Sequence, residues 1–367
     1  MTFEQRLADI VRGMKAQGLV RLVGVHDGAH FIEKPDPVLV LTGFKSMGPC
    51  AVVLGDSGGR VLVVTPAWDA ARAERICPGV RVVSADDVVE GLAALKLGAG
   101  ATGSAGIDML PFGIASRLVA LMPGTVGADN VVFDAARTKT DTEISHAREA
   151  TRIAELGYAR LLDMAKPGVT EDELAVDQRW HAKSLGAEDN FVLLCAGPHN
   201  KAVAPSHGRA LQEGDSIVVE LTPSYRGQLV QICRTIVIGQ ANDLMREKYA
   251  LVVKAMHAGI AAAQPGRPMA DVCRAINAVL EAEGYGEFCY PPHIRRRGHG
   301  LGFGSIEPGD VALDNDTILE PGMLFMIHPN QYLPEVGYLL CGEPVLITAT
   351  CGVPLTAQFA ALAEVGV

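Results

Sequence analysis

The stretch Gly298-His299-Gly300-Leu301-Gly302-Phe303-Gly304-Ser305-Ile306-Glu307-Pro308 decides the fold, because a ligand-competent histidine interrupts an otherwise apolar run. Polar side chains interrupt three other apolar segments in the same way: Glu220 and Gln231 in 215–235, His328 in 320–329, and Glu343 in 338–347. Segment 215–235 is predicted to form a β-hairpin that places Glu220 and Gln231 on neighbouring strands. Together the four segments predict a single site.

Around this site the sequence predicts two domains. Between Leu19 and about Val132, short apolar runs alternate with helix-like stretches at 68–76 and 88–97, which is typical of a small α/β domain. After a polar break at 137–143, an α+β pattern of long helices separated by hairpins begins. We expect domains at 1–136 and 137–367. The long helices are predicted at 144–165, 171–185, 243–263 and 270–283.

The composition excludes several classes of protein. Hydrophobic residues make up 49% of the 367 residues and charged residues 20%, so the chain can bury a core and is not intrinsically disordered. Asp and Glu number 42 against 32 Lys and Arg, so we expect no binding of nucleic acid or anionic lipid through charge alone. The chain has no apolar run of membrane-spanning length and no signal-peptide pattern, and its eight scattered cysteines are expected to be reduced thiols. These features predict a cytoplasmic protein with a small-molecule substrate.

The order and spacing of the polar segments resemble the pita-bread family of creatinase, aminopeptidase P, prolidase and methionine aminopeptidase. The segment 298–302 (GHGLG) is similar to the family's GHGIG motif, and 137–144 (RTKTDTEI) to its R-x-K-x-x-x-E-I linker. Segments 319–323 (LEPGM) and 352–356 (GVPLT) agree as well. The resemblance spans nearly the whole chain. It implies an α+β pita-bread catalytic domain at 137–367, a smaller α/β creatinase-like domain before it, and a homodimer.

In the peptidases of that family, two Asp, one His and two Glu hold two divalent ions. At the corresponding positions this chain has, in order, Glu220, Gln231, His299, His328 and Glu343. Because Gln231 replaces a bridging carboxylate by a neutral amide, repulsion between two dications would be poorly compensated, and a dinuclear centre is not expected.

The proton-shuttling histidine of the family's H-E-x-P motif is also missing, since Ile306 stands in its place. Hydrolysis of peptide bonds by the usual route of the family is therefore not expected.

Two mechanisms remain open for the altered set. In a metal-free site of the creatinase type, carboxylates would hold a cationic or amide-bearing substrate while His299 or His328 activates water. Alternatively, one Zn, Mn or Fe ion would be bound by His299, His328 and Glu343 with Gln231 or Glu220. In the metal-free case, Glu343→Gln should lower turnover with little loss of thermal stability. Ordinary core, turn or edge-strand roles are the competing interpretation, and the collinearity with the family's ligand positions argues against it.

Four residues are candidates for substrate binding: Gln231, Tyr225, His207 and Arg297. Gln231 is expected to orient the substrate, and Tyr225 follows Glu220 in the same hairpin. His207 lies in a segment, 195–208, that resembles the family's substrate-facing loop, although the register places 203 or 204 at the position of its histidine. Arg297 ends a run of three arginines, which suits a carboxylate-bearing substrate, a subunit contact or a solvated face.

The function expected from these features is hydrolysis of a C–N bond in a small non-peptide amide, amidine or lactam-like molecule. Glu220, His299, His328 and Glu343 are the expected catalytic residues, with no firmly required cofactor and one divalent ion as the alternative. The alternative functions are a metal-dependent Xaa-Pro aminopeptidase or dipeptidase, a single-metal lyase on the same fold, and a catalytically inactive binding protein. Histidine or glutamate at four of the five ligand positions argues against the inactive protein.

Overall fold

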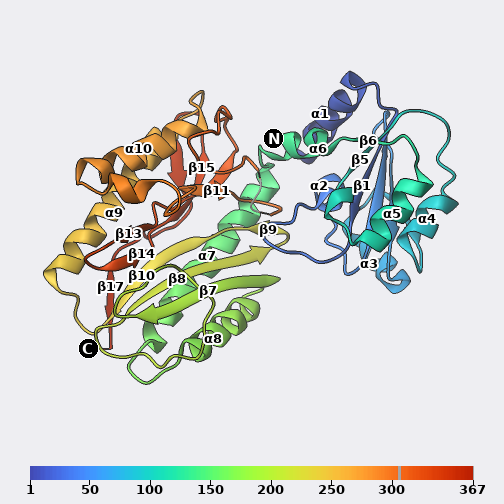
Figure 1. Cartoon of the computed structure of the whole chain (residues 1–367). Helices are drawn as coiled ribbons and strands as arrows, with labels where there is room; N and C mark the ends of the chain where they lie inside the picture. Colours follow the sequence, from blue (N-terminus) through green and yellow to red (C-terminus); the bar gives the residue numbers. More distant parts are fainter. Residues whose placement is uncertain (305–306, 367) are drawn as a thin grey trace. The chain divides into compact units, whose positions relative to one another are not determined.

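Six strands in the order β4-β3-β2-β1-β5-β6 form a mixed sheet in the N-terminal part of the computed structural model, which describes residues 1–304 and 307–366 (Figure 1). This sheet belongs to the first of two units, Met1–Asp141 and Thr142–Val367. Its strands are β1 (Arg21–His26), β2 (Cys50–Gly55), β3 (Arg60–Val64), β4 (Arg81–Ser84), β5 (Thr102–Ala105) and β6 (Val126–Gly127). Its helices are α1 (Phe3–Ala16), α2 (Pro37–Thr42), α3 (Ala70–Ile76), α4 (Val88–Ala94), α5 (Phe112–Leu121) and α6 (Asp129–Ala136).

The first turn of α2 fixes the end of the loop that follows β1. Asp36 is the N-cap, because its Oδ1 accepts a hydrogen bond of 2.8 Å from the backbone N–H of Leu39. Pro37 occupies the first helical position, where its missing N–H costs nothing. The loop 27–36 is therefore held between β1, whose last residue is His26, and a capped helix.

The second unit contains two larger sheets and a two-stranded ribbon. One sheet has the order β17-β10-β8-β7 with β9 paired to β8, the other has the order β11-β12-β15-β16, and β13 pairs with β14. Its helices are α7 (Asp141–Met164), α8 (Glu171–Ser184), α9 (Asp243–Ala262) and α10 (Met269–Ala282). Its strands are β7 (Asp189–Gly197), β8 (Ser216–Tyr225), β9 (Gln228–Leu229), β10 (Ile232–Ile238), β11 (Gly298–Gly300), β12 (Leu324–Ile327), β13 (Gln331–Leu333), β14 (Gly337–Leu339), β15 (Glu343–Ile347), β16 (Gly352–Pro354) and β17 (Ala363–Val365).

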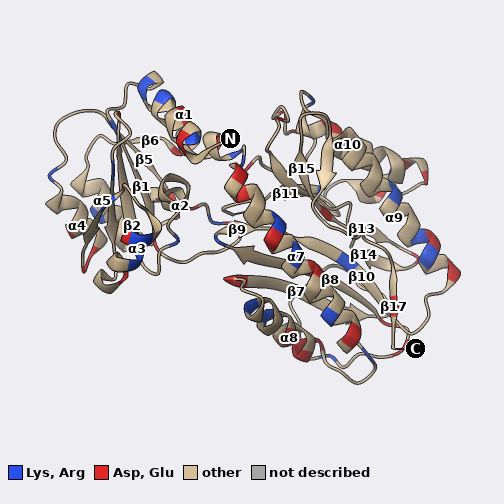
Figure 2. Ribbon diagram, turned by 180° about the vertical axis from the view of Figure 1, so that it is seen from behind, with Lys and Arg blue, Asp and Glu red and all other residues tan. Residues whose placement is uncertain are grey.

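A backbone bridge joins the two larger sheets of this unit. Cys233 of β10 and Gly342, just before β15, exchange hydrogen bonds of 3.3 and 3.1 Å through their peptide groups. Apolar clusters fill both sides: α7 and α8 cover one face of the β8 sheet, and α9 and α10 cover the β12 sheet. In Figure 2 the charged residues follow helices such as α1, α7, α8 and α9, whereas the strands carry few of them.

The fold class predicted from the sequence is confirmed, with a smaller α/β unit followed by an α+β pita-bread unit. All four long helices begin and end within a few residues of the predicted ranges. The described residues contain no helix that is long and apolar enough to cross a membrane. All eight cysteines are free thiols, and only Cys351 is exposed.

Candidate active site

Strand β8 presents Glu220 on the face that meets the second sheet. Ile217, Val219 and Leu221 pack among residues of α7 and α8, whereas Val218 packs with apolar residues of β12 and with Ala147 and Ala150 of α7. Side chains alternate between the two faces of a strand, so Glu220 lies on the same face as Val218. The period of the strand thus points this carboxyl into the space between the two sheets, where it is 9% exposed.

Gln231 links Glu220 to His299. Its Nε2 lies 3.3 Å from Glu220 Oε2 and 3.2 Å from Thr222 Oγ1, and its Oε1 lies 3.1 Å from His299 Nε2. Asn330 Nδ2 donates to the other oxygen of Glu220 at 3.4 Å. The hairpin predicted from the sequence therefore brings Glu220 and Gln231 together, and β11 adds His299 to them.

The contacts of His299 restrict its tautomer. Its Nδ1 lies 2.9 Å from the carbonyl oxygen of Gly300, which can only accept, so Nδ1 carries the proton. In the neutral ring, Nε2 then turns a lone pair toward the amide group of Gln231. As oriented, the two facing atoms are both acceptors. The contact is satisfied by a cation between the two atoms, by an amide turned to donate its N–H, or by a doubly protonated ring that donates from Nε2.

Two glycines allow the strand of His299 to approach its neighbours. A Cβ atom on Gly298 would lie 1.9 Å from Met326 O, and one on Gly300 would lie 2.4 Å from the carbonyl carbon of Glu307. Gly298 also has a φ of 152°, which a residue with a side chain rarely adopts. The glycines of the GHG motif therefore fix the depth at which His299 sits.

His328 follows β12 and stacks obliquely on His299, with ring centroids 5.3 Å apart. The side chain is buried, and its Nδ1 has no hydrogen-bond partner. Burial, with help from the neighbouring His299, lowers the pKa of His328 well below its ordinary value. His328 is therefore neutral at physiological pH and offers an unused lone pair.

Glu343, the fifth residue of the set, is held in a buried ion pair. Its Oε1 lies 3.1 Å from Arg234 Nη2 and accepts the backbone N–H of Ala360 at 2.7 Å, while its Oε2 accepts the hydroxyl of Thr356 at 2.6 Å. Burial raises the pKa of Glu343, although these three contacts act in the opposite direction. The sequence predicted that Glu343→Gln causes little loss of thermal stability. The ion pair changes this expectation, because the substitution would leave the guanidinium of Arg234 buried without its partner.

Burial also shifts the pKa of Glu220. It raises the pKa of this carboxyl to about 7, with smaller opposing contributions from Cys233, Arg296 and Asn330. A buried carboxyl of this kind changes its protonation state close to neutral pH.

The set of donors suits one divalent ion better than two. Glu220 and Glu343 supply two negative charges at most, and Glu343 is already neutralised by Arg234, so two dications would find too little compensating charge. His299 Nε2 faces Gln231 Oε1, and Nδ1 of His328 has no hydrogen-bond partner among the described residues, so these are the donors that one ion would use. The charge of the set suits one ion better than a dinuclear centre.

The remaining candidates lie in different surroundings. His207 is 65% exposed and pairs with Glu171 at the start of α8, its Nδ1 lying 2.7 Å from Oε2. Tyr225 ends β8 and packs edge-on against His146 of α7, with ring centroids 5.8 Å apart. Substrate binding by these two residues stays a prediction. The prediction for Ile306 falls outside the described residues.

Arg297 is part of the scaffold. Its side chain is fully buried, and its guanidinium donates to Asn277 Oδ1 at 2.7 Å and to the carbonyl oxygens of Pro329 and Asn330 at 2.9 and 3.1 Å. These bonds hold the segment that follows His328. Among the described residues the second guanidinium nitrogen, Nη2, has no hydrogen-bond partner, so contact between Arg297 and the substrate stays a prediction.

Sequence reasoning missed Arg234 and Asn330, which hold the two acids. A signal for Arg234 was available, since it is the one charged residue in the apolar run 232–238 (ICRTIVI), and a charge in a buried strand needs a partner. Asn330 carries no comparable signal, because asparagine after a proline is common in turns.

Comparisons with known proteins agree with this architecture. The profile of metallopeptidase family M24 matches residues 145–349. A Xaa-Pro dipeptidase from Pyrococcus furiosus is 26% identical over 94% of this chain and 95% of its own, and a probable dipeptidase, PepE, from Mycobacterium bovis is 31% identical over 76% of each chain. The crystal structure of the prolidase from Pyrococcus horikoshii superposes with a TM-score of 0.85 over 97% of this chain and 99% of its own, at 22% identity.

These comparisons overturn the expected substrate class. The sequence predicted a non-peptide amide, amidine or lactam-like molecule and a creatinase-like reaction, on the strength of the altered ligand positions. Relatives that match 94% and 76% of the chain are named dipeptidases, and the matching family is one of metallopeptidases, so that prediction is wrong.

Proposed function

The chain belongs to metallopeptidase family M24, and from this premise we propose that it hydrolyses the peptide bond of dipeptides, with Xaa-Pro dipeptides as the first class to test. The observation that carries the proposal is the near full-length match to a Xaa-Pro dipeptidase. The cluster of Glu220, Gln231, His299 and His328 supports it, since these side chains come from three separate segments and converge in one buried place.

We further propose that the site works with one divalent ion, held by His299, His328 and Gln231. Such an ion would polarise the scissile carbonyl and lower the pKa of a bound water molecule. The neutral tautomer of His299 directs Nε2 into the site because Nδ1 is bonded to Gly300. His328 offers its buried Nδ1, which has no other partner.

The two acids have different roles in this proposal. Glu343 is committed to Arg234 and Thr356 and braces the strand that closes the site. Glu220 is placed to accept a proton from the attacking water and return it to the leaving amine. Gln231, which is bonded to Glu220, would keep that carboxyl turned toward the ion.

The test is release of proline from Ala-Pro and Met-Pro by protein stripped with a chelator and then reloaded with Mn²⁺, Zn²⁺, Co²⁺ or Fe²⁺. We expect turnover only after reloading, and one bound ion fewer in His299→Ala than in the unchanged protein. His257→Ala, an exposed histidine on α9, is the matched control for His299→Ala. Full activity in the stripped protein would refute the metal requirement, and the loss of two bound ions in His299→Ala would refute the single-ion active site.

A catalytically inactive protein is the competing outcome, because Gln231 stands where the family's peptidases carry an acid. Gln231→Asp tests it directly, since the change restores a carboxylate at that position. A protein inactive on all dipeptides that gains hydrolysis with Gln231→Asp would assign the wild-type chain to the inactive class. We also propose a homodimer from the family resemblance, and light scattering of the purified protein would test it.

A further inference from the structure

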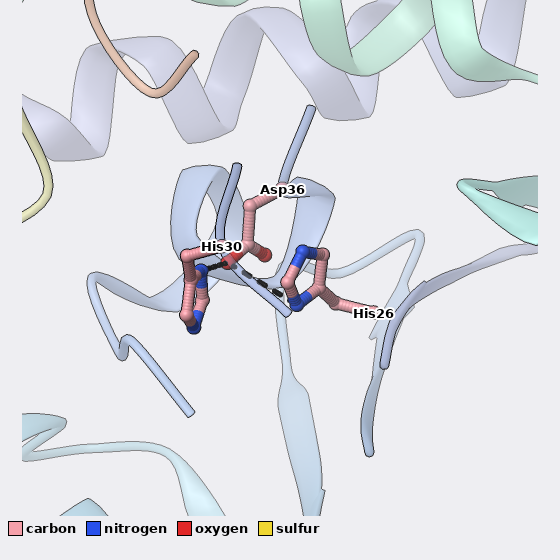
Figure 3. Close-up of side chains that lie close together, drawn as sticks. All are labelled: His26, His30 and Asp36. Atoms are coloured by element: carbon pink, nitrogen blue, oxygen red, sulfur yellow. Dashed lines mark ion pairs between the residues drawn. The ribbon is translucent and has the colours of Figure 1, made fainter. Parts of the chain in front are cut away.

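A second cluster of ligand-type side chains lies in the N-terminal unit, outside the candidate active site. It consists of His26 at the end of β1, His30 in the following loop and Asp36 at the N-cap of α2. One ligand atom from each residue lies within 4.8 Å of the others, and among residues 1–304 and 307–366 no other three His, Cys, Asp or Glu side chains come together in this way. Figure 3 shows the carboxylate of Asp36 between the two imidazole rings.

The hydrogen bonds around the cluster determine which atoms carry protons. His30 Nε2 lies 2.8 Å from the carbonyl oxygen of Ser46, so Nε2 is protonated and Nδ1 turns its lone pair toward Asp36 Oδ2, 3.3 Å away. His26 Nδ1 accepts the backbone N–H of Gly28 at 3.0 Å and is therefore unprotonated, at 3.7 Å from the same oxygen. Asp36 Oδ2 and the lone pair of His30 Nδ1 thus face each other, and His26 Nδ1, whose lone pair accepts the N–H of Gly28, lies beside them.

Burial makes such an arrangement costly without a cation. The side chains of His26 and Asp36 are 1% and 4% exposed, and Asp36 Oδ2 has no hydrogen-bond donor. An unsatisfied buried polar atom of this kind destabilises the fold. A bound cation would satisfy Asp36 Oδ2 and the lone pair of His30 Nδ1, and it would take the lone pair of His26 Nδ1 in place of the Gly28 N–H.

We propose that His26, His30 and Asp36 form a binding site for one divalent transition-metal ion, with Zn²⁺ as the preferred occupant. Two imidazoles and one carboxylate form a donor set that suits Zn²⁺, and water would complete a tetrahedron. With metal–ligand bonds of about 2.0–2.1 Å, the donor atoms of a tetrahedral site lie about 3.3 Å apart. The 3.3 Å separation of His30 and Asp36 already has this value, and a rotation of the His26 ring that releases the Gly28 N–H would shorten the 3.7 Å separation.

The surroundings support the donors in the way that metal sites require. The bond from His30 Nε2 to Ser46 orients that ring, and the bond from Leu39 to Asp36 Oδ1 fixes the carboxylate. His30 is 21% exposed, which gives an ion a route from solvent. Lys34 is nearby, and its positive charge is offset by Asp27 at 2.5 Å. The ion would tie the loop 27–36 to both β1 and α2.

A shared proton is the rival occupant, because burial raises the pKa of Asp36 to about 7. The decisive experiment is a Zn²⁺ titration of the full-length protein at pH 8, after chelator stripping, in competition with a chromophoric chelator. The background is the double variant His299→Ala/His328→Ala, which removes the two histidines of the candidate active site. We expect one equivalent of Zn²⁺ with a Kd of about 1 µM or tighter, and Co²⁺ in its place should show tetrahedral visible absorption.

In this background, His30→Ala and Asp36→Asn should each weaken Zn²⁺ binding at least about 100-fold, more than is typical for loss of an outer contact. Asparagine also caps helices well, so Asp36→Asn keeps α2 intact, which far-ultraviolet circular dichroism will verify. The matched control is Asp56→Asn, which changes an exposed acid of the same unit and should leave the affinity unchanged. The proposal is wrong if the double variant His299→Ala/His328→Ala binds no equivalent of Zn²⁺ tightly. It is also wrong if Asp36→Asn and Asp56→Asn bind Zn²⁺ with equal affinity.

Discussion

Replacing Glu343 by glutamine should destabilise the C-terminal unit, because it leaves Arg234 buried without a counter-charge. The two side chains are 3% and 0% exposed and lie 3.1 Å apart. Removing one partner of a buried pair costs about 3–5 kcal/mol, and glutamine keeps hydrogen-bonding capacity toward Thr356 and Ala360, so we expect about 3 kcal/mol. In a unit of this size that corresponds to a fall in Tm of roughly 6–12 °C.

Thermal unfolding followed by circular dichroism measures this effect. Glu364→Gln is the matched control, because Glu364 pairs with Arg246 at a similar distance, 2.9 Å, but on the surface, with side chains 29% and 48% exposed. Ion pairs on the surface contribute about 0–1 kcal/mol to stability, so the Tm of Glu364→Gln should hardly differ from that of the unchanged protein. Adding Arg234→Met to Glu343→Gln should recover at least about 1 kcal/mol relative to the sum of the single changes. Equal melting of Glu343→Gln and the control would refute the reasoning.

Three further predictions concern single side chains. His299→Ala and His328→Ala should each lose the bound ion and reduce dipeptide turnover at least about 100-fold, as measured by metal analysis and proline release. The pKa of Glu220 is about 7 in the folded protein and near 4.5 in the unfolded chain, so its ionisation lowers the stability of the fold as the pH rises from about 4.5 to 7. In chelator-treated protein, Glu220→Gln should therefore raise the free energy of unfolding by up to about 3 kcal/mol at pH 8 and hardly at all at pH 4.5. Urea denaturation at the two pH values measures this difference. In the native protein Cys351 should react with a thiol reagent far faster than the seven buried cysteines, and rapid labelling of more than one thiol would contradict the structure.

Much of the fold could be predicted from the sequence because its elements have strong local signals. The α9 helix starts at an Asn242 cap and α8 at a capping box between Thr170 and Glu173, so both boundaries are encoded within a few residues. The start of α1 is encoded in the same way, by a capping box between Thr2 and Gln5, but this helix was not predicted. The short strand β13 was missed because three residues carry too little periodicity.

The candidate site was harder to predict because its electrostatics depend on contacts between distant segments. Alternation along β8 was enough to pair Glu220 with Gln231, eleven positions later in the hairpin. The partner of Glu343 is 109 positions away in sequence, and only the bridge between the two sheets brings Arg234 to it. The cluster of His26, His30 and Asp36 escaped notice because no regular spacing marks it.

The glycines beside His299 have a consequence for protein engineering. Since no side chain fits at Gly298 or Gly300, these two glycines hold the main chain of β11 close to its neighbours. We expect this main chain to keep its position when the side chains that face His299 are replaced. A directed-evolution library that randomises 220, 231 and 328 while leaving both glycines unchanged would therefore sample new reactions on a constant frame. A library that randomises the glycines would spend most of its members on proteins that do not fold. Because the glycines fix the main chain and the site side chains do not, an amide can stand at position 231 while the chain keeps the architecture of its relatives.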